Sequence, residues 1–236
     1  MWPWQRIPGW QQRGHWLALA QVLLLGALIG LSQAVAAWAY WNFSRLIDTA
    51  EKRYGNLGNA RVRILAWETL FKDSAHLAEQ VKLDNVNRFF NRQIRFADDI
   101  RVWQQVDYWA TPIESLIKGA GDCEDYAIAK YFSLRRLGIS SEKLRITYVK
   151  ALRLNQAHMV LTYYSSPAAE PLVLDNLINQ IRPASQRQDL LPVYAFNAEG
   201  LYLPGSRSKK SDSKKLSRWQ DLLKKMHTEG FAIGEG

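Results

Sequence analysis

The sequence contains one cysteine, Cys123, among its 236 residues. A single cysteine cannot form an intrachain disulfide, so the folded body depends on its apolar core, and the chain is long enough to build one. The sequence also lacks a recognisable nucleic-acid-binding module, although its formal net charge is +9. Basic residues recognise nucleic acid when they are joined to such a module. We therefore expect no nucleic-acid partner.

The positive charge is concentrated toward the two ends of the chain. Residues 206–236 hold eight Lys or Arg and four Asp or Glu, a net +4, and residues 1–37 hold +2, which leaves +3 between them. We expect residues 206–236 to be a solvated basic tail that is disordered over 206–215 and helical over 216–226. The domain itself is predicted over residues 38–205.

The N-terminal segment has the pattern of an export signal. Residues 1–15 carry two arginines and no acids, residues 16–31 are apolar apart from Gln21, and small residues follow at 32–37. This order is typical of a signal peptide, with cleavage near Ala36. The apolar run is long for a signal peptide and short for a membrane span, so an uncleaved signal anchor is an alternative. Either way we expect export, and an oxidising compartment favours a function for the single thiol.

The cysteine lies at a predicted helix start. Gly119 and Gly121 precede it, and a helical pattern begins at Cys123. A helix N-terminus stabilises a thiolate, which is the nucleophilic form of cysteine. The placement therefore indicates a nucleophile, and the alternative is a small buried side chain without a chemical role.

A cysteine nucleophile needs a base and a group that orients the base. Among the four histidines, His158 lies in a predicted strand over 156–164, and a turn separates it from a second apolar strand that ends with Asp175. A hairpin centred near residues 166–167 would put His158 directly opposite Asp175, within reach of a hydrogen bond. The alternative is a half-buried strand histidine and an aspartate that merely ends a strand.

The order of helical and strand patterns predicts an α+β fold, with a helical layer packed on an antiparallel sheet. Helices are expected over 44–54, 59–71 and 79–93, and strands over 144–152, 156–164, 172–176, 192–197 and 200–203. Thr111, Pro112 and Glu114 have the pattern of one more helix N-terminus, just before the loop that leads to Cys123.

Four short segments together resemble the bacterial transglutaminase-like cysteine proteinases, and among these the LapG-type proteases. The segments are 108–112, 121–127, 157–161 and 172–176. The resemblance runs from about residue 60 to residue 205. It implies a transglutaminase/papain-like fold in which Cys123 is the nucleophile, His158 the base and Asp175 the orienting group.

The resemblance also implies a substrate and a partner. LapG-type proteases are periplasmic and calcium-dependent. They cut the N-terminal region of a large surface adhesin next to paired alanines, which releases the adhesin and disperses a biofilm. An inner-membrane cyclic-di-GMP receptor inhibits such a protease by sequestering it. These properties imply a periplasmic endopeptidase, either free or anchored to the inner membrane.

Three acidic residues, Asp122, Glu124 and Asp125, surround the cysteine. Uncompensated, they would raise the pKa of the thiol, and a bound divalent cation would remove that effect. Oxygen ligands suit calcium, which takes about six to eight of them. The spacing is not that of an EF-hand, and acids are favoured in the first turn of any helix, so the residues alone favour helix capping. The resemblance reverses this preference and implies a calcium site.

Two other functions stay open. An amide-transferring enzyme on the same fold would use an amine in place of water as the acceptor. A catalytically silent module would use the same groove to bind a partner. The joint presence of Cys123, His158 and Asp175 argues against the silent module, because binding alone does not require all three.

Overall fold

The structure is a computed structural model in which residues 41–204, 209–211 and 216–232 are described. The predicted export signal and most of the stretch predicted to be disordered lie outside these ranges. Within them, no helix is long and apolar enough to span a membrane.

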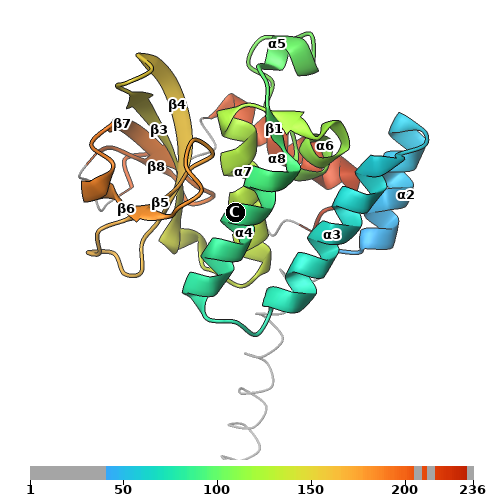
Figure 1. Ribbon diagram of the computed structural model, residues 1–236, viewed down its shortest axis with the longest axis horizontal. Coiled ribbons are helices and arrows are strands. Elements are labelled where there is room, and N and C mark those ends of the chain that lie inside the picture. The colour runs from blue at the N-terminus through green and yellow to red at the C-terminus, as the bar shows by residue number, and fades with distance from the viewer. Residues whose placement is uncertain (1–40, 205–208, 212–215, 233–236) are drawn as a thin grey trace, which may run out of the picture. The chain divides into compact units, whose positions relative to one another are not determined.

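Three helices of the first half form a layer on one side of the folded body (Figure 1). They are α2 (Phe43–Tyr54), α3 (Asn59–Ser74) and α4 (Glu79–Gln93), at the positions predicted from the apolar spacing. Trp67 of α3 is fully buried, and its ring packs against Phe71 and Phe90. Burial of one such side chain contributes roughly 1.5–3 kcal/mol, so these rings anchor the layer.

Helix α7 (Cys123–Arg136) is packed on both sides, against α4 and against a strand of the sheet (Figure 1). Every residue from Glu124 to Leu134 is buried. A helix that is covered on two sides has no single polar face, which explains why its apolar residues do not follow one stripe. This packing fixes the helix and therefore the position of Cys123, its first residue.

The sheet has six antiparallel strands in the order β6-β5-β4-β3-β7-β8. Its strands are β3 (Leu144–Ala151), β4 (Gln156–Tyr163), β5 (Leu172–Leu174), β6 (Arg182–Pro183), β7 (Leu190–Phe196) and β8 (Leu201–Tyr202). With the helices on one face, this is the predicted α+β architecture. Only β6 has no counterpart among the predicted strands, because two residues are too short to show an alternating pattern.

A short parallel pair lies beside the start of α7. Strand β1 (Arg95–Phe96) pairs with β2 (Ala120–Gly121), and a short helix, α5 (Asp99–Val102), follows β1. Helix α6 (Pro112–Lys118) leads into β2. These elements bring the chain around residue 99 next to the loop before Cys123, although the two are far apart in sequence.

The start of α6 is the predicted capping box. The Thr111 hydroxyl accepts from the Glu114 backbone N–H, and the Glu114 carboxylate accepts from the Thr111 backbone N–H. The helix ends at Gly119, whose φ of +59° is left-handed and favours glycine. Because both ends of α6 are fixed, the segment that leads to Cys123 starts from a defined position.

The C-terminal helix α8 (Ser217–Glu229) belongs to the folded body, and the prediction of a solvated tail is wrong for it. Trp219 is buried and stacks on Phe132 of α7, with ring centroids 5.4 Å apart, and Leu222 and Met226 are also buried. These three residues recur at helical spacing and form an apolar stripe. The helix is thus predicted from the sequence, whereas its many charged residues favour a solvated interpretation over the packing that the structure shows.

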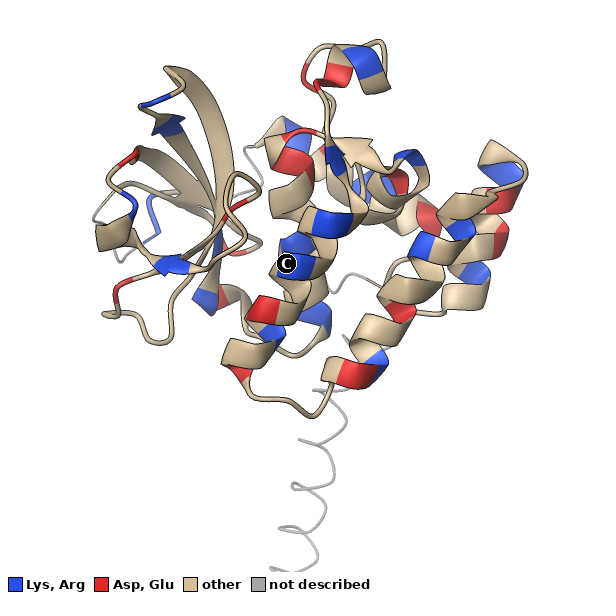
Figure 2. Ribbon diagram, viewed as in Figure 1, with Lys and Arg blue, Asp and Glu red and all other residues tan. Residues whose placement is uncertain are grey.

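Figure 2 shows how charge is distributed over the helical layer. Positive and negative residues are interspersed along α2, α3 and α4. Some of these charges pair directly, as Lys72 does with Glu68 at 2.9 Å. Exposed pairs of this kind contribute little to stability, and their main effect is to solvate the helices.

Candidate active site

Cys123 occupies the first turn of α7, as the sequence predicts. Asp122 is the N-cap residue, with an extended backbone, and β2 ends one residue earlier at Gly121. A Cβ atom on Gly121 would lie 2.5 Å from Asp125 Oδ2, so only glycine allows this close approach of loop and helix. As the first helical residue, Cys123 has a backbone N–H without an acceptor inside the helix.

The thiol is half-buried and has two polar neighbours. It donates to Glu124 Oε2 at 3.1 Å, and it lies within hydrogen-bonding range of the Met159 backbone N–H on β4. Burial raises the pKa of Cys123, and the carboxylates of Glu124 and Asp122 raise it further, while the Met159 N–H lowers it. In this arrangement the protonated thiol is strongly favoured.

His158 and Asp175 are joined by the predicted hydrogen bond. His158 Nε2 lies 2.8 Å from Asp175 Oδ1, and both side chains are buried. The predicted register is wrong, however: Thr162 pairs with Val173, which puts the hairpin centre one residue later than expected. The bond is therefore diagonal across the two strands, a separation that a long ring can bridge.

Asp175 lies one residue beyond β5 and is held from several sides. Its Oδ1 also accepts from the Leu177 backbone N–H at 3.0 Å, and its Oδ2 accepts from Arg187 Nη2 at 2.7 Å. Asn91 of α4 donates to its main-chain carbonyl at 2.9 Å. Burial alone would raise the pKa of Asp175, but the hydrogen bond from His158, with those from Leu177 and Arg187, lowers it to about 2.

This ionisation state determines which ring nitrogen of His158 is available. An ionised Asp175 can only accept, so the proton of the neutral imidazole resides on Nε2. The lone pair is then on Nδ1, which can take a proton from another group. His158 immediately precedes Met159, whose backbone N–H is beside the thiol. Within the described residues, the side-chain hydrogen bond of the thiol goes to Glu124 rather than to His158.

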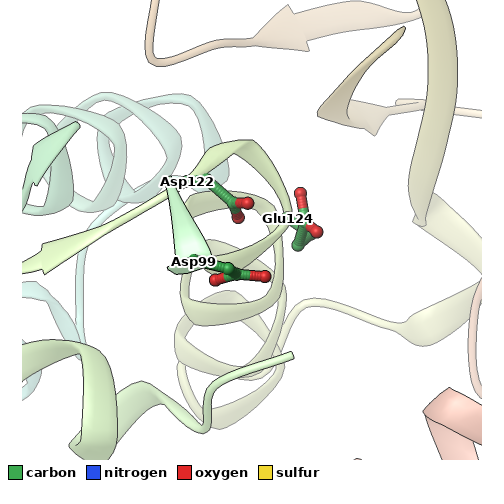
Figure 3. A group of neighbouring side chains, drawn as sticks. All are labelled: Asp99, Asp122 and Glu124. Carbon is green, nitrogen blue, oxygen red and sulfur yellow. The ribbon is translucent and has the colours of Figure 1, made fainter. Parts of the chain in front are cut away.

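Three carboxylates form a compact group beside the cysteine. Asp99, Asp122 and Glu124 each contribute an oxygen, and these oxygens lie within 4.8 Å of one another. Figure 3 shows the three side chains as close neighbours at the start of α7. Asp99 Oδ1 and Asp122 Oδ1 are buried without a hydrogen-bond partner among the described residues. An all-oxygen set with unpaired buried atoms is suited to a hard cation such as calcium.

The carboxylates perturb one another. Burial and the neighbouring Glu124 and Asp125 raise the pKa of Asp122 to about 10. Burial also raises the pKa of Asp99 to about 6, against the effect of a hydrogen bond from the Tyr108 backbone N–H. Like charges at this separation cannot all remain ionised without compensation. The group therefore needs either protons or a cation.

The structure differs from the predicted metal ligands at one residue: Asp99 takes the place of Asp125. Asp122 and Glu124 belong to the group, whereas Asp125 lies outside it. Asp125 is fully buried, its Oδ1 accepts from the Ala110 backbone N–H at 2.8 Å, and its Oδ2 lies against Gly121. Successive residues of a first helical turn point in different directions, so Asp125 faces the protein interior.

Two residues of this region have no signal in the sequence. Asp99 joins the carboxylate group only because β1 pairs with β2, and strands of two residues leave no pattern. Arg187 comes from the connection between β6 and β7, with no motif around it. Both contacts depend on tertiary structure rather than on local spacing.

Comparisons with known proteins agree with this geometry. The family model of the bacterial transglutaminase-like cysteine proteinases matches residues 68–189. The solved structure of Legionella pneumophila LapG is 44% identical, with a TM-score of 0.67, and the match covers 77% of this chain and 97% of that chain.

Two further solved structures of the Legionella pneumophila protein also match. The EGTA-treated form is 44% identical with a TM-score of 0.69, over 77% of this chain and 97% of that chain. The calcium-bound form is 42% identical with a TM-score of 0.68, over 79% of this chain and 99% of that chain. A comparison with curated proteins gave no match. On the family model and on these structures, the chain belongs to the bacterial transglutaminase-like cysteine proteinases and is a cysteine protease of the LapG type.

Proposed function

We propose that this protein is a calcium-dependent periplasmic endopeptidase with a Cys123–His158–Asp175 triad. Its substrate is the N-terminal region of a large surface adhesin, cut near paired alanines, and the cut releases the adhesin and promotes biofilm dispersal. One observation carries the proposal: a thiol at a helix start lies against the strand that bears His158, and His158 is bonded to a buried, ionised Asp175.

The residues suggest the following steps. His158 Nδ1 accepts the proton of the Cys123 thiol, and the sulfur attacks the carbonyl carbon of the peptide. The Cys123 backbone N–H stabilises the oxyanion that forms. His158 then gives its proton to the leaving amine, which leaves a thioester on the sulfur. Water, deprotonated by the same imidazole, hydrolyses the thioester and restores the thiol.

Asp175 keeps the ring in position through the whole cycle. It accepts from Nε2, so Nδ1 remains the nitrogen that exchanges a proton with sulfur. When the ring is protonated, the carboxylate stabilises the imidazolium by direct charge pairing. Because Asp175 has a pKa of about 2, it stays ionised over the whole working range of pH.

Asp99, Asp122 and Glu124 are the residues that would hold calcium. Support comes from their oxygens, two of them buried and unpaired, and from the calcium-bound LapG among the similar structures. A bound cation would supply positive charge beside Cys123 and offset the carboxylates that disfavour the thiolate. It would also engage Glu124, which otherwise accepts from the thiol.

Location and regulation are proposed from the family resemblance. The apolar segment near the N-terminus would export the protein to the periplasm, with or without anchoring to the inner membrane. There an inner-membrane cyclic-di-GMP receptor would sequester the protease and prevent adhesin cleavage.

A cleavage assay tests the proposal. The substrate is an N-terminal adhesin fragment from the same genome that contains paired alanines, with a fragment whose alanines are replaced by bulky residues as its control. The protein is tested in calcium, in chelator, and as Cys123→Ala. We expect cleavage only by the wild-type protein in calcium and only of the fragment with paired alanines.

Product analysis separates the possible reactions. New N- and C-termini mean hydrolysis, whereas a cross-link to an added amine means amide transfer and would replace the proposal. Cleavage by a folded Cys123→Ala variant above trace level would remove this residue from the mechanism. Failure of the folded wild-type protein to act under any of these conditions would favour a binding module.

A further inference from the structure

We propose that Arg187 is a positioning residue of the active site, which locks the Asp175 carboxylate in the orientation that holds the His158 ring. This inference rests on the proposed function, because it assigns Arg187 a role in the triad. Among the described residues, the side-chain hydrogen bonds of Arg187 go to Asp175 and Asp189 and not to the thiol, so Arg187 acts through Asp175.

The hydrogen bonds of Asp175 divide between its two oxygens. Oδ1 accepts from His158 and from the Leu177 backbone N–H, whereas Oδ2 accepts from Arg187 Nη2. The Asp175 side chain is completely buried, so no water is available as a substitute partner. Without Arg187, one oxygen of a buried carboxylate would have no donor, which strongly disfavours the ionised form. The carboxylate would also be free to rotate and exchange its oxygens.

Arg187 is fixed on its other side. Asp189 accepts from Arg187 Nε at 3.0 Å and from Nη2 at 2.9 Å, a two-point contact that sets the plane of the guanidinium. The backbone is held as well, because the Arg187 N–H donates to the Ala184 carbonyl and the Leu190 N–H donates to the Arg187 carbonyl. The Arg187 side chain is only 3% exposed. These contacts hold the guanidinium in place independently of its bond to Asp175.

A second basic side chain acts on Asp175 without replacing Arg187. Lys130 of α7 is fully buried and interacts with Asp175 through charge alone. Its Nζ makes no hydrogen bond to any described residue and lies over the Tyr126 ring, 5.6 Å from the centroid. Burial lowers the pKa of Lys130 to about 7, so its charge is lost as pH rises through that value, whereas Arg187 stays charged. The charged and titratable groups that face Asp175 are thus His158, Arg187 and Lys130, and of the two basic side chains Arg187 and Lys130 only Arg187 bonds the carboxylate.

The test uses two rates measured on the purified full chain in calcium buffer. One is cleavage of the adhesin fragment, resolved into kcat and KM. The other is alkylation of the thiol by iodoacetamide between pH 5 and pH 8, which reports a single site because Cys123 is the only cysteine. Arg187→Gln is compared with Arg182→Gln, a matched control on an exposed arginine of β6 that bonds Gln180.

We expect Arg187→Gln to lower kcat roughly ten- to hundredfold with KM unchanged, since a misplaced base loses rate rather than binding. The loss in both rates should be larger at pH 5 than at pH 8, because removal of the cation raises the pH at which Asp175 takes up a proton. Arg187→Lys keeps the charge and should recover part of kcat. Arg182→Gln should match the wild type.

A folded Arg187→Gln variant with wild-type kcat and a wild-type alkylation profile would overturn the inference, and so would a loss confined to KM. If that variant does not fold, Asp189→Asn decides the question, because it keeps Arg187 but weakens its anchor. It should show the same pH-dependent loss at smaller size, and wild-type rates would count against the inference. If no fragment is cleaved by any protein, alkylation still tests Arg187, and only the proposed function fails.

Discussion

In the cluster of His158, Asp175 and Arg187 a carboxylate lies between two hydrogen-bond donors, whereas the cluster of Asp99, Asp122 and Glu124 contains carboxylates alone. Both clusters are largely buried. The first contains His158, the proposed base, and the second lies beside Cys123. In the first cluster each carboxylate oxygen of Asp175 has a donor. In the second, an oxygen of Asp99 and one of Asp122 have none among the described residues.

The pKa shifts follow from this difference. Hydrogen bonds in the first cluster overcome burial and lower the pKa of Asp175 to about 2. In the second cluster, burial and like charge act together and raise the pKa of Asp122 to about 10. A buried carboxylate stays ionised when side chains of the protein donate hydrogen bonds or positive charge to it. When the neighbouring side chains are all carboxylates, the negative charge must be neutralised by protons or by a bound cation.

The largest effect on the cleavage rate should come from Asp175→Asn, which removes the carboxylate that joins His158 and Arg187. The amide can present its N–H₂ group to His158, which favours the wrong tautomer and removes the charge that stabilises the imidazolium. We expect the cleavage rate to fall roughly 10³–10⁴-fold with the fold retained. Steady-state cleavage, together with far-UV circular dichroism, measures both. A rate equal to that of the wild type would show that Asp175 merely ends a strand.

A large effect is also expected when the second cluster loses its cation. Chelator should strongly lower the cleavage rate and lower Tm, and calcium should restore both. At a calcium concentration 100 times its Kd, binding would stabilise the fold by about 3 kcal/mol, which corresponds to a Tm shift of roughly 5–10 °C for a chain of this size.

The adjacent acids Asp98 and Asp99 provide a matched pair for this prediction. Asp99 is buried in the cluster and Asp98 is exposed. Asp99→Asn should remove most of the Tm response to calcium, and Asp98→Asn should keep it. Equal responses from the two variants would mean that calcium, if bound, is held elsewhere.

The smallest effect is on the pH dependence of stability, where the two clusters should act with opposite sign. The folded pKa of Asp175, about 2, lies below the usual 3.8, so it contributes about 2 kcal/mol above pH 4 that is lost as pH falls toward 2. The folded pKa of Asp99, about 6, is raised, so in chelator its contribution is present below pH 4 and lost as pH rises from 4 to 6.

Denaturant unfolding at several pH values measures this dependence. In chelator, Asp99→Asn should make the decline between pH 4 and 6 less steep, while the decline that Asp122 contributes as pH rises from 4 toward 10 remains, and it should leave the acid side below pH 4 unchanged. A decline of the same size in the variant would assign it to other groups.

The sequence predicts those parts of the structure that depend on neighbouring residues. The α6 capping box joins residues three apart, and the helices follow from apolar spacing within single segments. The His158–Asp175 bond spans a single hairpin and was predicted in the wrong register, because the turn residues do not determine its centre.

The remaining contacts depend on long-range packing. Asp99 reaches Asp122 through two-residue strands, and Arg187 reaches Asp175 from a connection without a motif. The helix over 216–226 is predicted, but its charged sequence does not indicate that Trp219, Leu222 and Met226 pack into the core. In each case the deciding interaction is with a segment far away along the chain, which local spacing does not encode.

The most direct measurement is the rate of alkylation of Cys123 at pH 7, in calcium and in chelator, for the wild type and for Asp99→Asn. If a cation is the missing compensation of the carboxylate cluster, calcium should accelerate alkylation of the wild type on the order of tenfold, the effect of lowering the thiol pKa by one unit. Asp99→Asn should lose most of that acceleration. An equal rate with and without calcium, in a wild-type protein whose Tm rises on calcium binding, would contradict a link between the metal and the thiol.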